Sequence, residues 1–414
     1  MEAPWVPKPS RADRGWRRGR HGASVKDDGV VTGVAQEVIA QDLRAMLRGA
    51  VRLGLEACLD AELQAMIGAD WYARGGGRRD HRNGSYRRQF LTSFGQVELA
   101  MPRGRRGGRP SQVLGRYQRR MDEVDGLLTS AYVSGVSTRK LGTVTTALLG
   151  ERVSRSTVSR VTERLTQTVE GLRRAPIVGP HPYLVLDATF LEARWARRVE
   201  HVSVLVAYAV GADGYRHLLG ITLGAEESEA SWRELLAQRT ERGLSGVQLV
   251  IADDHAGLAA AVRHWLPEAR RQRCTVHLGR NVLTKVPHRL RARVAREVMA
   301  VLHGVSLADA KTRLARFGGR WERQLPEAVA CLRAGFAAAT TDFAFPQAHW
   351  VRLRTTNGVE RLHREIKRRT RAVGAFPDRA SALRLVTAVA IGATAIWGDR
   401  QYLDMTLLEA AQAA

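Results

Sequence analysis

The sequence predicts an α/β protein in which a sheet carrying acidic side chains is flanked by helical regions. The segment 183–191 (YLVLDATFL) is a short apolar run that contains a single carboxylate, Asp187. A second apolar segment, 247–252, ends abruptly at Asp253 and Asp254. Short apolar runs rich in β-branched residues are typical of buried strands. Elsewhere, long stretches repeat their apolar residues at helical spacing, so we expect helices on both sides of these strands in the chain.

The chain is strongly basic, with 65 Lys and Arg residues against 41 Asp and Glu residues and a formal charge of +24. This balance favours a polyanionic partner such as nucleic acid. Three widely spaced cysteines give no disulfide framework and fit a reducing cytosol. We find no signal-peptide core, and the longest uncharged apolar stretch, 385–397, is too short to cross a bilayer. The sequence therefore predicts a cytoplasmic, nucleoid-associated protein without membrane association.

The N-terminal part is expected to be a DNA-binding region. Residues 1–33 are polar and Gly-rich and predict a disordered basic tail, whereas apolar residues at helical spacing from 34 to 67 predict one or two amphipathic helices. Alternation over 86–106 predicts a small β-hairpin that turns near 93–96. We interpret 34–120 as a helical and β-hairpin DNA-binding region, with a plain solvated surface as the alternative. The candidate phosphate contacts are Arg82, Arg87, Arg88, Arg103 and Arg105.

The segment 121–175 predicts a helix-turn-helix. Two helical stretches are separated at Gly150, and Ser154 or Ser156 is a natural N-cap for the second. In such a motif the second helix enters the major groove, although any capped helical hairpin looks similar. The candidate DNA contacts are Arg139, Lys140, Arg155 and Arg160.

The segment 181–287 predicts the first part of a catalytic core. After the Asp187 strand, a hairpin turns at Asp213 and Gly214, and an amphipathic helix over 229–242 leads to the Asp253 strand. A further helix and strand follow. The resulting order of three strands, helix, strand, helix, strand is that of ribonuclease-H-like folds, so we expect this fold.

The remainder of the chain is predicted to be helical. Residues 288–345 are rich in Ala and Arg and show no strand pattern, which predicts an all-α insertion. The segment 346–400 then completes the core with a basic helix carrying Glu360 and with an apolar C-terminal helix.

Three acids from separate parts of the core are candidate metal ligands. Burying an ionised carboxylate is costly unless the group is paired or holds a cation, although a strand-end Asp187 that only caps its turn is the alternative. Asp187, Asp253 and Glu360 offer hard oxygen ligands that suit Mg²⁺ or Mn²⁺. Two such ions would support phosphoryl transfer. On the Glu360 helix, Arg364, Lys367 and Arg371 fall within about 40° of the Glu360 direction, which suits holding a DNA strand beside the ions.

These residues resemble the IS256-type transposases of bacterial insertion sequences, within the Mutator-like group. The resemblance implies a DDE triad of Asp187, Asp253 and Glu360, in which Asp253 rather than Asp254 is the second acid; a share for Asp254 in metal binding stays open. His277 stands three residues after Cys274, in the C-x2-H spacing of the group, and is expected to orient the scissile phosphate. The matching segments, from about residue 60 to 390 and in the family's order, are RNGSYRR, the hairpin 92–105, GVSTRK, LDATF, ESEASW, ADDHAGL, QRCTVHLGRN and TTNGVERLHREIKRRTR.

The function that this resemblance implies is DNA transposition. The protein is expected to bind the terminal inverted repeats in double-stranded DNA and to catalyse Mg²⁺-dependent phosphodiester cleavage and strand transfer into target DNA. Bringing two ends together implies a homodimer or higher oligomer. Two alternatives stay open: a domesticated DNA-binding regulator without catalysis, and a stand-alone ribonuclease-H-like nuclease.

Overall fold

The computed structural model describes residues 28–70, 77–106, 111–195, 198–224 and 226–413. The first 27 residues of the predicted tail lie outside this part. The chain divides into two compact units, one formed by Met1–Phe90 with Gln96–Gln118 and the other by Leu91–Gly95 with Arg119–Ala414. Each unit is described by itself.

The first unit contains one long helix and most of a β-hairpin. Helix α1 (Asp28–Ile67) is continuous over 40 residues and begins six residues before its predicted start. The predicted hairpin is observed as β1 (Arg82–Thr92) and β2 (Gly95–Gly104), which form a two-stranded sheet. The end of α1 and alternate residues of β2 are buried, and the Glu56 carboxylate accepts a hydrogen bond from the Ala100 N–H at 2.8 Å.

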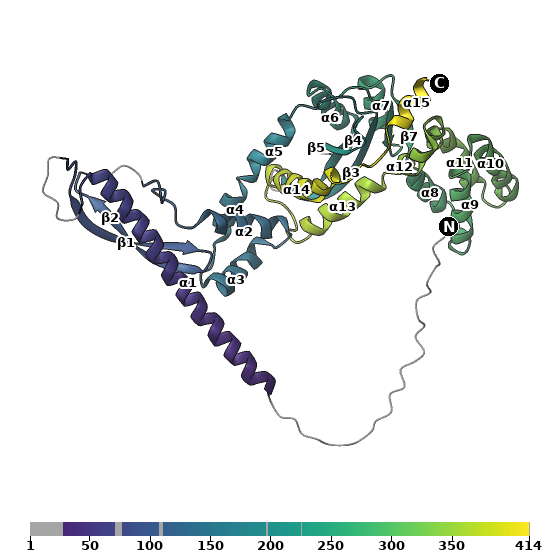
Figure 1. The fold of residues 1–414 in the computed structure, drawn as a ribbon. Helices are drawn as coiled ribbons and strands as arrows, with labels where there is room; N and C mark the ends of the chain where they lie inside the picture. Colours follow the sequence, from purple (N-terminus) through teal and green to yellow (C-terminus); the bar gives the residue numbers. More distant parts are fainter. Residues whose placement is uncertain (1–27, 71–76, 107–110, 196–197, 225, 414) are drawn as a thin grey trace, which may run out of the picture. The chain divides into compact units, whose positions relative to one another are not determined.

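The second unit is built on a five-stranded sheet with the order β5-β4-β3-β6-β7 (Figure 1). The central strand β3 pairs antiparallel with β4 and parallel with β6; β5 extends the sheet antiparallel and β7 extends it parallel. The predicted order of strands and helices is observed. The elements are β3 (Tyr183–Trp195), β4 (Arg198–Val210), β5 (Arg216–Gly224), α6 (Glu229–Glu241), β6 (Leu249–Ala252), α7 (Ala256–Trp265) and β7 (Arg270–Arg273).

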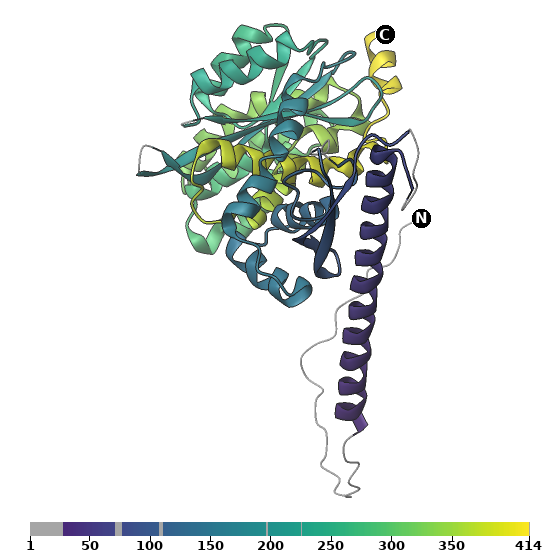
Figure 2. The same ribbon diagram turned by 90° about the vertical axis from the view of Figure 1, so that its left-hand side faces the viewer.

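Helices cover both faces of this sheet (Figures 1 and 2). Tyr183 and Val185 of β3 belong to a core shared with α13 (Asn357–Thr370) and α14 (Arg379–Thr394). The alternate residues Leu184 and Leu186 belong to a second core shared with α6 and α7. Because both faces of β3 are buried, its sequence is a continuous apolar run instead of an alternating one.

Four helices precede the sheet in the second unit: α2 (Asp122–Val133), α3 (Thr138–Leu149), α4 (Arg155–Thr162) and α5 (Leu165–Arg174). The break predicted at Gly150 is observed, since this residue ends α3 with a left-handed φ of 71° that favours glycine. Of the two predicted caps, Ser154 occupies the N-cap and accepts a hydrogen bond from the Thr157 N–H. Buried residues of α2, α3 and α4 share one small core.

An all-α body follows β7. Helices α9 (His288–Leu302), α10 (Leu307–Trp321) and α11 (Pro326–Ala339) lie in the predicted insertion. They share their core with α8 (Thr275–Thr284), which precedes the predicted boundary at 288. Helix α8 therefore belongs by packing to the all-α body while following directly on the sheet. The remaining elements are η1 (Thr341–Ala344), η2 (Gln347–His349), α12 (Trp350–Leu353), η3 (Ala395–Gly398) and α15 (Thr406–Ala413).

The apolar C-terminal segment is a core helix of the second unit. In the part of the chain that the structure describes, one segment, Arg379–Gly398, is long and apolar enough to cross a membrane by composition, with a mean hydropathy of 1.5. Its residues Leu385, Val386 and Val389 are buried in the core shared with β3. The apolar residues of α14 therefore cover one face of the sheet.

A buried ion pair joins the all-α body to the chain that leads into α13. Arg354 Nε donates to Asp342 Oδ2 at 2.7 Å, and both side chains are almost fully buried. The Arg354 guanidinium also lies over the rings of Phe343 and Trp350, 5.2 Å from each centroid. Removing one member of a buried pair leaves the other charge uncompensated, which costs more free energy than the pair itself contributes.

We predict that Arg354→Met lowers the free energy of unfolding by about 3 to 5 kcal/mol, because Asp342 is then buried without a counter-charge. Denaturant titration followed by tryptophan fluorescence measures this change. Arg323→Met is the matched control, since Arg323 is exposed, and it should leave the transition unchanged. Adding Asp342→Leu to Arg354→Met should recover part of the loss; equal stability of Arg354→Met and wild type would contradict the assignment.

Candidate active site

The register of two parallel strands aligns the first two predicted acids. Val185 of β3 pairs with Ile251 of β6. Asp187 stands two residues after Val185, and Asp253 stands two residues after Ile251. The two acids therefore occupy corresponding positions beyond the paired part of these parallel strands. Strand β6 ends at Ala252, which places Asp253 in the first residue of the following loop.

Side-chain alternation places both acids on the same face of the sheet. Val185 and Ile251 belong to the core beneath α13 and α14, and side chains two residues apart on a strand point to the same face. Asp187 therefore faces α13, and Asp253 follows the same alternation at the strand end. Asp254, one residue further, follows the opposite alternation.

Contacts between two helix N-termini bring Glu360 to this edge. The buried Cys274 precedes α8, and its sulfur accepts hydrogen bonds from the Thr356 N–H and hydroxyl, each at 3.5 Å. Thr275 donates from its N–H and its hydroxyl to the Arg354 carbonyl at 2.9 and 3.0 Å. Thr356 is the N-cap of α13, and its hydroxyl bonds to Cys274 instead of capping the helix. Glu360, in the first turn of α13, is thereby fixed beside the first turn of α8.

His277 lies between the acids. Its Nδ1 atom is 3.9 Å from Asp253 Oδ2, and its Nε2 atom is 3.5 Å from Glu360 Oε1. Glu360 Oε1 also accepts a hydrogen bond at 3.1 Å from Arg280, which stands three residues after His277 on the same helix. The three predicted acids and His277 are thus brought together from β3, the end of β6, α8 and α13.

The electrostatics of the cluster are dominated by buried negative charge. Burial raises the pKa of Asp187 to about 7; Glu360 and Asp253 add to the rise, while His277 and the hydrogen bond from the Ala188 N–H oppose it. Interaction with the Cys274 side chain, and with Asp253 and Asp187, raises the pKa of His277 to about 9 against the effect of burial. His277 is therefore a cation at neutral pH, and Asp187 lacks a full counter-charge.

A second histidine contacts the central acid and was not predicted from the sequence. His363 Nδ1 lies 3.4 Å from Asp187 Oδ2. Burial, followed by the charges of Lys367 and His277, lowers the pKa of His363 to about 3, so this imidazole is neutral. The sequence signal was its position three residues after Glu360, which places it about 60° away around α13 on the side that faces the sheet. Arg280 was missed in the same way, three residues after His277.

Asp254 is held away from the cluster by two arginines. Its carboxylate lies 2.8 Å from Arg273 Nη1 and 3.6 Å from Arg271 Nη2, both on β7. The sequence left open a role for Asp254 in metal binding. In this structure Asp254 bonds to the neighbouring strand, whereas Asp253 faces His277, and metal binding by either acid stays a prediction.

The donor chemistry fits a divalent cation, although the side chains do not form a closed ligand set as they stand. Within the described residues, no group of three or more His, Cys, Asp or Glu side chains is close enough to share an ion. Asp187, Asp253 and Glu360 supply hard carboxylate oxygens, and the raised pKa of Asp187 shows that a nearby cation would stabilise its ionised form. The Cys274 sulfur is engaged with Thr356, which argues against a zinc site built on Cys274 and His277.

Most of the predicted DNA contacts in the second unit are exposed. Arg364 and Lys367 lie on the exposed side of α13, in the same helix as Glu360, and the exposed Arg371 is the C-cap of this helix. Arg139 and Lys140 are exposed in the first turn of α3, and Arg155 and Arg160 are exposed on α4.

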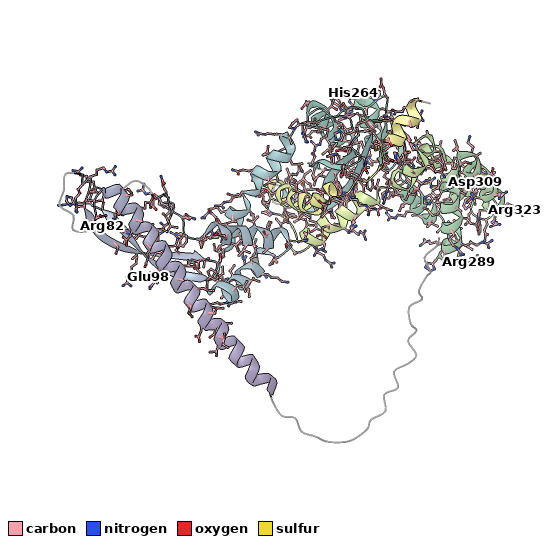
Figure 3. The ribbon with its side chains drawn as sticks, viewed as in Figure 1. Arg82, Glu98, His264, Arg289, Asp309 and Arg323 are labelled. Atoms are coloured by element: carbon pink, nitrogen blue, oxygen red, sulfur yellow. The ribbon has the colours of Figure 1, made fainter. Side chains whose placement is uncertain are left out.

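The predicted contacts on the hairpin fall into two groups; Figure 3 labels Arg82 of the first group and Glu98, a partner of the second. Arg82 and Arg88 bond within the protein, Arg82 to Asp60 at 3.4 Å and Arg88 to the carbonyls of Gly115 and Gln118. Three side chains are exposed: Arg87, which pairs with Glu98 at 3.0 Å, Arg103, which lies over the Tyr86 ring at 4.3 Å, and Arg105.

Comparison with known proteins gives consistent matches over most of the chain. A family model described as Transposase, Mutator family, matches residues 26–399. The transposase for insertion sequence element ISRM5 of Rhizobium meliloti is 35% identical over 360 residues, which cover 87% of this chain and 90% of the relative. The transposase for IS1081 of Mycobacterium tuberculosis is 35% identical, with 91% of each chain covered. The transposase for IS256 in transposon Tn4001 of Staphylococcus aureus is 35% identical, covering 82% and 88%.

Among solved structures, a chain of the simian T-cell lymphotropic virus intasome in complex with PP2A regulatory subunit B56 gamma aligns with 50% of this chain and 64% of its own length. Its sequence identity is 11% and its TM-score is 0.16, too low to support an argument about the fold.

We predict that Asp253→Asn weakens Mn²⁺ binding at least about a hundredfold, because it removes a carboxylate that faces the cluster. Asp254→Asn is the matched control on the adjacent residue and should bind Mn²⁺ like the wild type, since Asp254 bonds to Arg271 and Arg273. Titration calorimetry with Mn²⁺ measures both. Equal losses in the two variants would show that Asp254 shares the ion.

Proposed function

The chain belongs to the Mutator family of transposases and acts as a DNA transposase, and from this premise we propose that Asp187, Asp253 and Glu360 catalyse its DNA cleavage and strand transfer. The observation that carries the proposal is the shared position of these acids. The register of β3 and β6 aligns two of them on the face toward α13, and His277 lies between the second acid and Glu360.

The fold proposed for this core is ribonuclease-H-like. Its support is the sheet order β5-β4-β3-β6-β7, with two antiparallel strands on one side of β3 and two parallel strands on the other. The acids stand on the central strand, after the neighbouring parallel strand and on a helix that covers the sheet. The proposed parts of the core are 181–287 and 346–400, separated by the all-α segment 288–345.

The proposed cofactor is a pair of Mg²⁺ or Mn²⁺ ions held by the three carboxylates. When bound, such ions stabilise the attacking and leaving oxygens of a phosphodiester. The contacts of Glu360 with Arg280 and His277 both involve Oε1, so its Oε2 atom would be the one available to an ion. The neutral imidazole of His363 lies with its Nδ1 atom 3.4 Å from Asp187 Oδ2, a position suited to orienting that carboxylate.

The proposed reaction has two steps at this site. In the first, water attacks phosphorus at the transposon end and the 3′ oxygen leaves, which frees a 3′-hydroxyl group. In the second, that hydroxyl attacks a phosphate of the target DNA and displaces its 3′ oxygen, so the strands are joined without a covalent link to the protein. His277 carries a positive charge at neutral pH and lies beside two of the acids, a position suited to orienting the scissile phosphate.

We assign recognition of the terminal inverted repeats to the segments 34–120 and 121–175. The support is the set of exposed basic side chains on the hairpin, α3 and α4, and the capped turn between α3 and α4. Synapsis of two ends requires two copies of this region, so the proposed active form is a homodimer or higher oligomer. The proposed location is the cytoplasm, on the nucleoid.

We predict that Asp187→Asn, Asp253→Asn and Glu360→Gln each reduce cleavage and strand transfer by at least about 10³-fold, because each removes a charge that holds the ions. Binding to a duplex of the element's end should stay within a few-fold of wild type. Gel-based cleavage assays with Mg²⁺ and mobility shifts with EDTA separate the two activities.

A variant that keeps its activity would remove that residue from the triad. Wild-type protein that binds the end without cleaving it would favour a regulator, and cleavage without strand transfer would favour a nuclease.

We predict that binding to duplex DNA weakens with salt at a slope of about −0.9 per phosphate contacted. Lys367→Ala should reduce the magnitude of that slope by about one such unit, because Lys367 lies on the exposed side of α13. Lys311→Ala is the control, since Lys311 is exposed on α10 outside the proposed DNA-binding residues. Fluorescence anisotropy at increasing salt measures the slopes; a flat dependence in the wild type would contradict the basic-surface proposal.

A further inference from the structure

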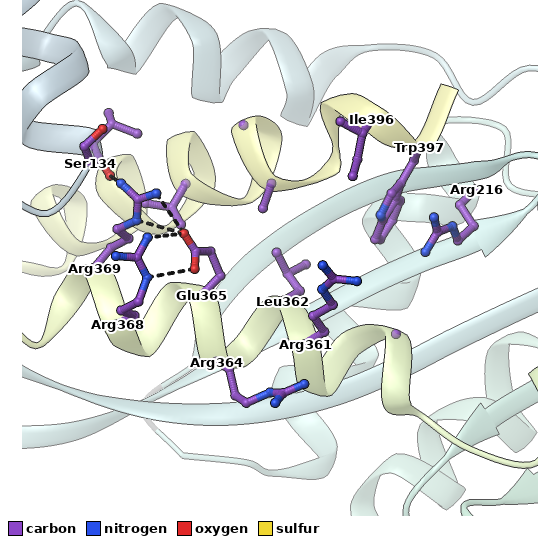
Figure 4. Close-up of a pocket in the computed structure, with 15 residues that line it drawn as sticks. Ser134, Arg216, Arg361, Leu362, Arg364, Glu365, Arg368, Arg369, Ile396 and Trp397 are labelled. Carbon is purple, nitrogen blue, oxygen red and sulfur yellow. Dashed lines mark hydrogen bonds and ion pairs between the residues drawn. The ribbon is translucent and has the colours of Figure 1, made fainter. Parts of the chain in front are cut away.

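A cleft of about 720 Å³ lies beside α13 (Figure 4). None of the three proposed catalytic acids lines it. It is lined by α13, by the end of α14 with η3, by Arg216 at the start of β5 and by the end of α2. At 100° per residue, Arg364 and Arg361 lie about 40° and 100° from Glu360 around α13. The exposed side of α13 therefore runs without interruption from the acid cluster to this cleft.

The charge of the cleft is strongly positive. Five arginines line it, and its single carboxylate, Glu365, is already bound by Arg368 at 2.7 and 2.9 Å and by Arg369 at 2.8 Å. The other three, Arg216, Arg361 and Arg364, make no ion pair with any part of the chain that the structure describes. Within the described residues the cleft therefore keeps a net positive charge, which favours an anionic ligand.

Arg216 is held in place without using its hydrogen-bond donors. Its guanidinium lies over the rings of Trp397 and Tyr402, 4.5 Å from each centroid, and Trp397 in turn packs edge-on against Tyr208 at 5.1 Å. Its buried Nε atom has no hydrogen-bond partner. A guanidinium fixed by aromatic rings, with free N–H groups, is preorganised for a phosphate group.

The cleft also offers apolar surface. Ile396 is 63% exposed at the rim, whereas Leu362, Val389 and Trp397 are buried and form its floor. Apolar surface next to arginines matches a nucleotide, whose sugar and base are apolar on their faces and whose phosphate is anionic. A small inorganic anion would leave this surface unused.

We propose that this cleft is a second DNA-binding site, which takes one nucleotide of a DNA strand that runs from the acid cluster across Arg364. The phosphate binds Arg216 and Arg361, and the sugar and base lie against Ile396 and Leu362. The site holds DNA on the α14 side of α13 while the acids act on the opposite side. This inference rests on the DNA-acting function of the family and does not require the proposed metal chemistry.

Binding of the full-length protein to a fluorescent duplex of the element's end, with EDTA present, tests the charge argument. Arg361→Glu should weaken binding about tenfold and reduce the magnitude of the salt slope by about one phosphate. Arg323→Glu, the same change at an exposed arginine in the all-α body (Figure 3), should change affinity less than about twofold. Equal effects of the two variants would overturn the proposal.

Photocrosslinking locates the DNA in a variant that keeps every arginine. Ile396 is replaced by p-benzoylphenylalanine, and Val305, an exposed residue of the all-α body, is replaced in the same way as a control. Crosslinks to DNA from position 396 but not from 305 support the site. Crosslinks from 396 to another protein chain, or none to DNA while binding is intact, overturn it.

The same samples separate this inference from the proposed reaction. A crosslink from position 396, together with cleavage by the Asp187→Asn variant, would support the cleft and remove Asp187 from the catalytic triad. Cleavage by the wild type together with normal end binding by Arg361→Glu would leave the triad intact and contradict the cleft.

Discussion

The parallel pairing of β3 with β6 is the constraint on which the rest of the site depends. Because side chains alternate along each strand, a shift of one residue would turn Asp253 away from α13 and bring Asp254 toward it. The observed register, with Val185 opposite Ile251, gives Asp187 and Asp253 the same level and the same face. The apolar neighbours of both acids fix this register, since they fill the two cores on either side of the sheet. The residues that stabilise the fold therefore also decide which acid of the pair faces the site.

The concentration of acids at this edge is costly, and the protein offsets the cost with its own cations. His277 stands between Asp253 and Glu360 with a raised pKa, and Arg280 bonds to Glu360. Asp187 is more deeply buried, and burial raises its pKa to about 7 although the charge of His277 and the hydrogen bond from the Ala188 N–H oppose the rise. The negative charge of these carboxylates is only partly neutralised, so a bound divalent cation would stabilise their ionised forms.

Helix α13 connects this cluster to the surface that we propose binds DNA. Its buried side packs on the sheet, one exposed edge carries Glu360, and the remaining exposed arc carries arginines as far as the cleft next to α14. The N-terminus of this helix is anchored to α8 through Cys274 and Thr356. The buried contact between Arg354 and Asp342 fixes the chain that precedes it. Because α13 is anchored at its N-terminus, Glu360 and the arginines of this helix keep fixed positions relative to one another.

The sequence by itself determined the local features. Short apolar runs predicted β3 and β6, and helical spacing and Ser caps predicted α3, α4 and α6. These features depend on neighbours within a few residues, so periodicity, capping and burial cost are sufficient to predict them. That the three acids act together stays a prediction. The resemblance of the sequence to a transposase family, which extends over most of the chain, agrees with the family model that matches residues 26–399.

Only the tertiary structure decided the features that depend on pairing between distant segments. Strand register separated Asp253 from Asp254, because β7 supplies the two arginines that bind Asp254. The approach of α13 to the sheet revealed His363, and the packing of α8 with α9 and α11 moved the boundary of the all-α body. The cleft around Arg216 combines β5, α13 and η3, which are far apart in the sequence. Each of these follows from how separate elements pack, and a pattern within one element does not contain that information.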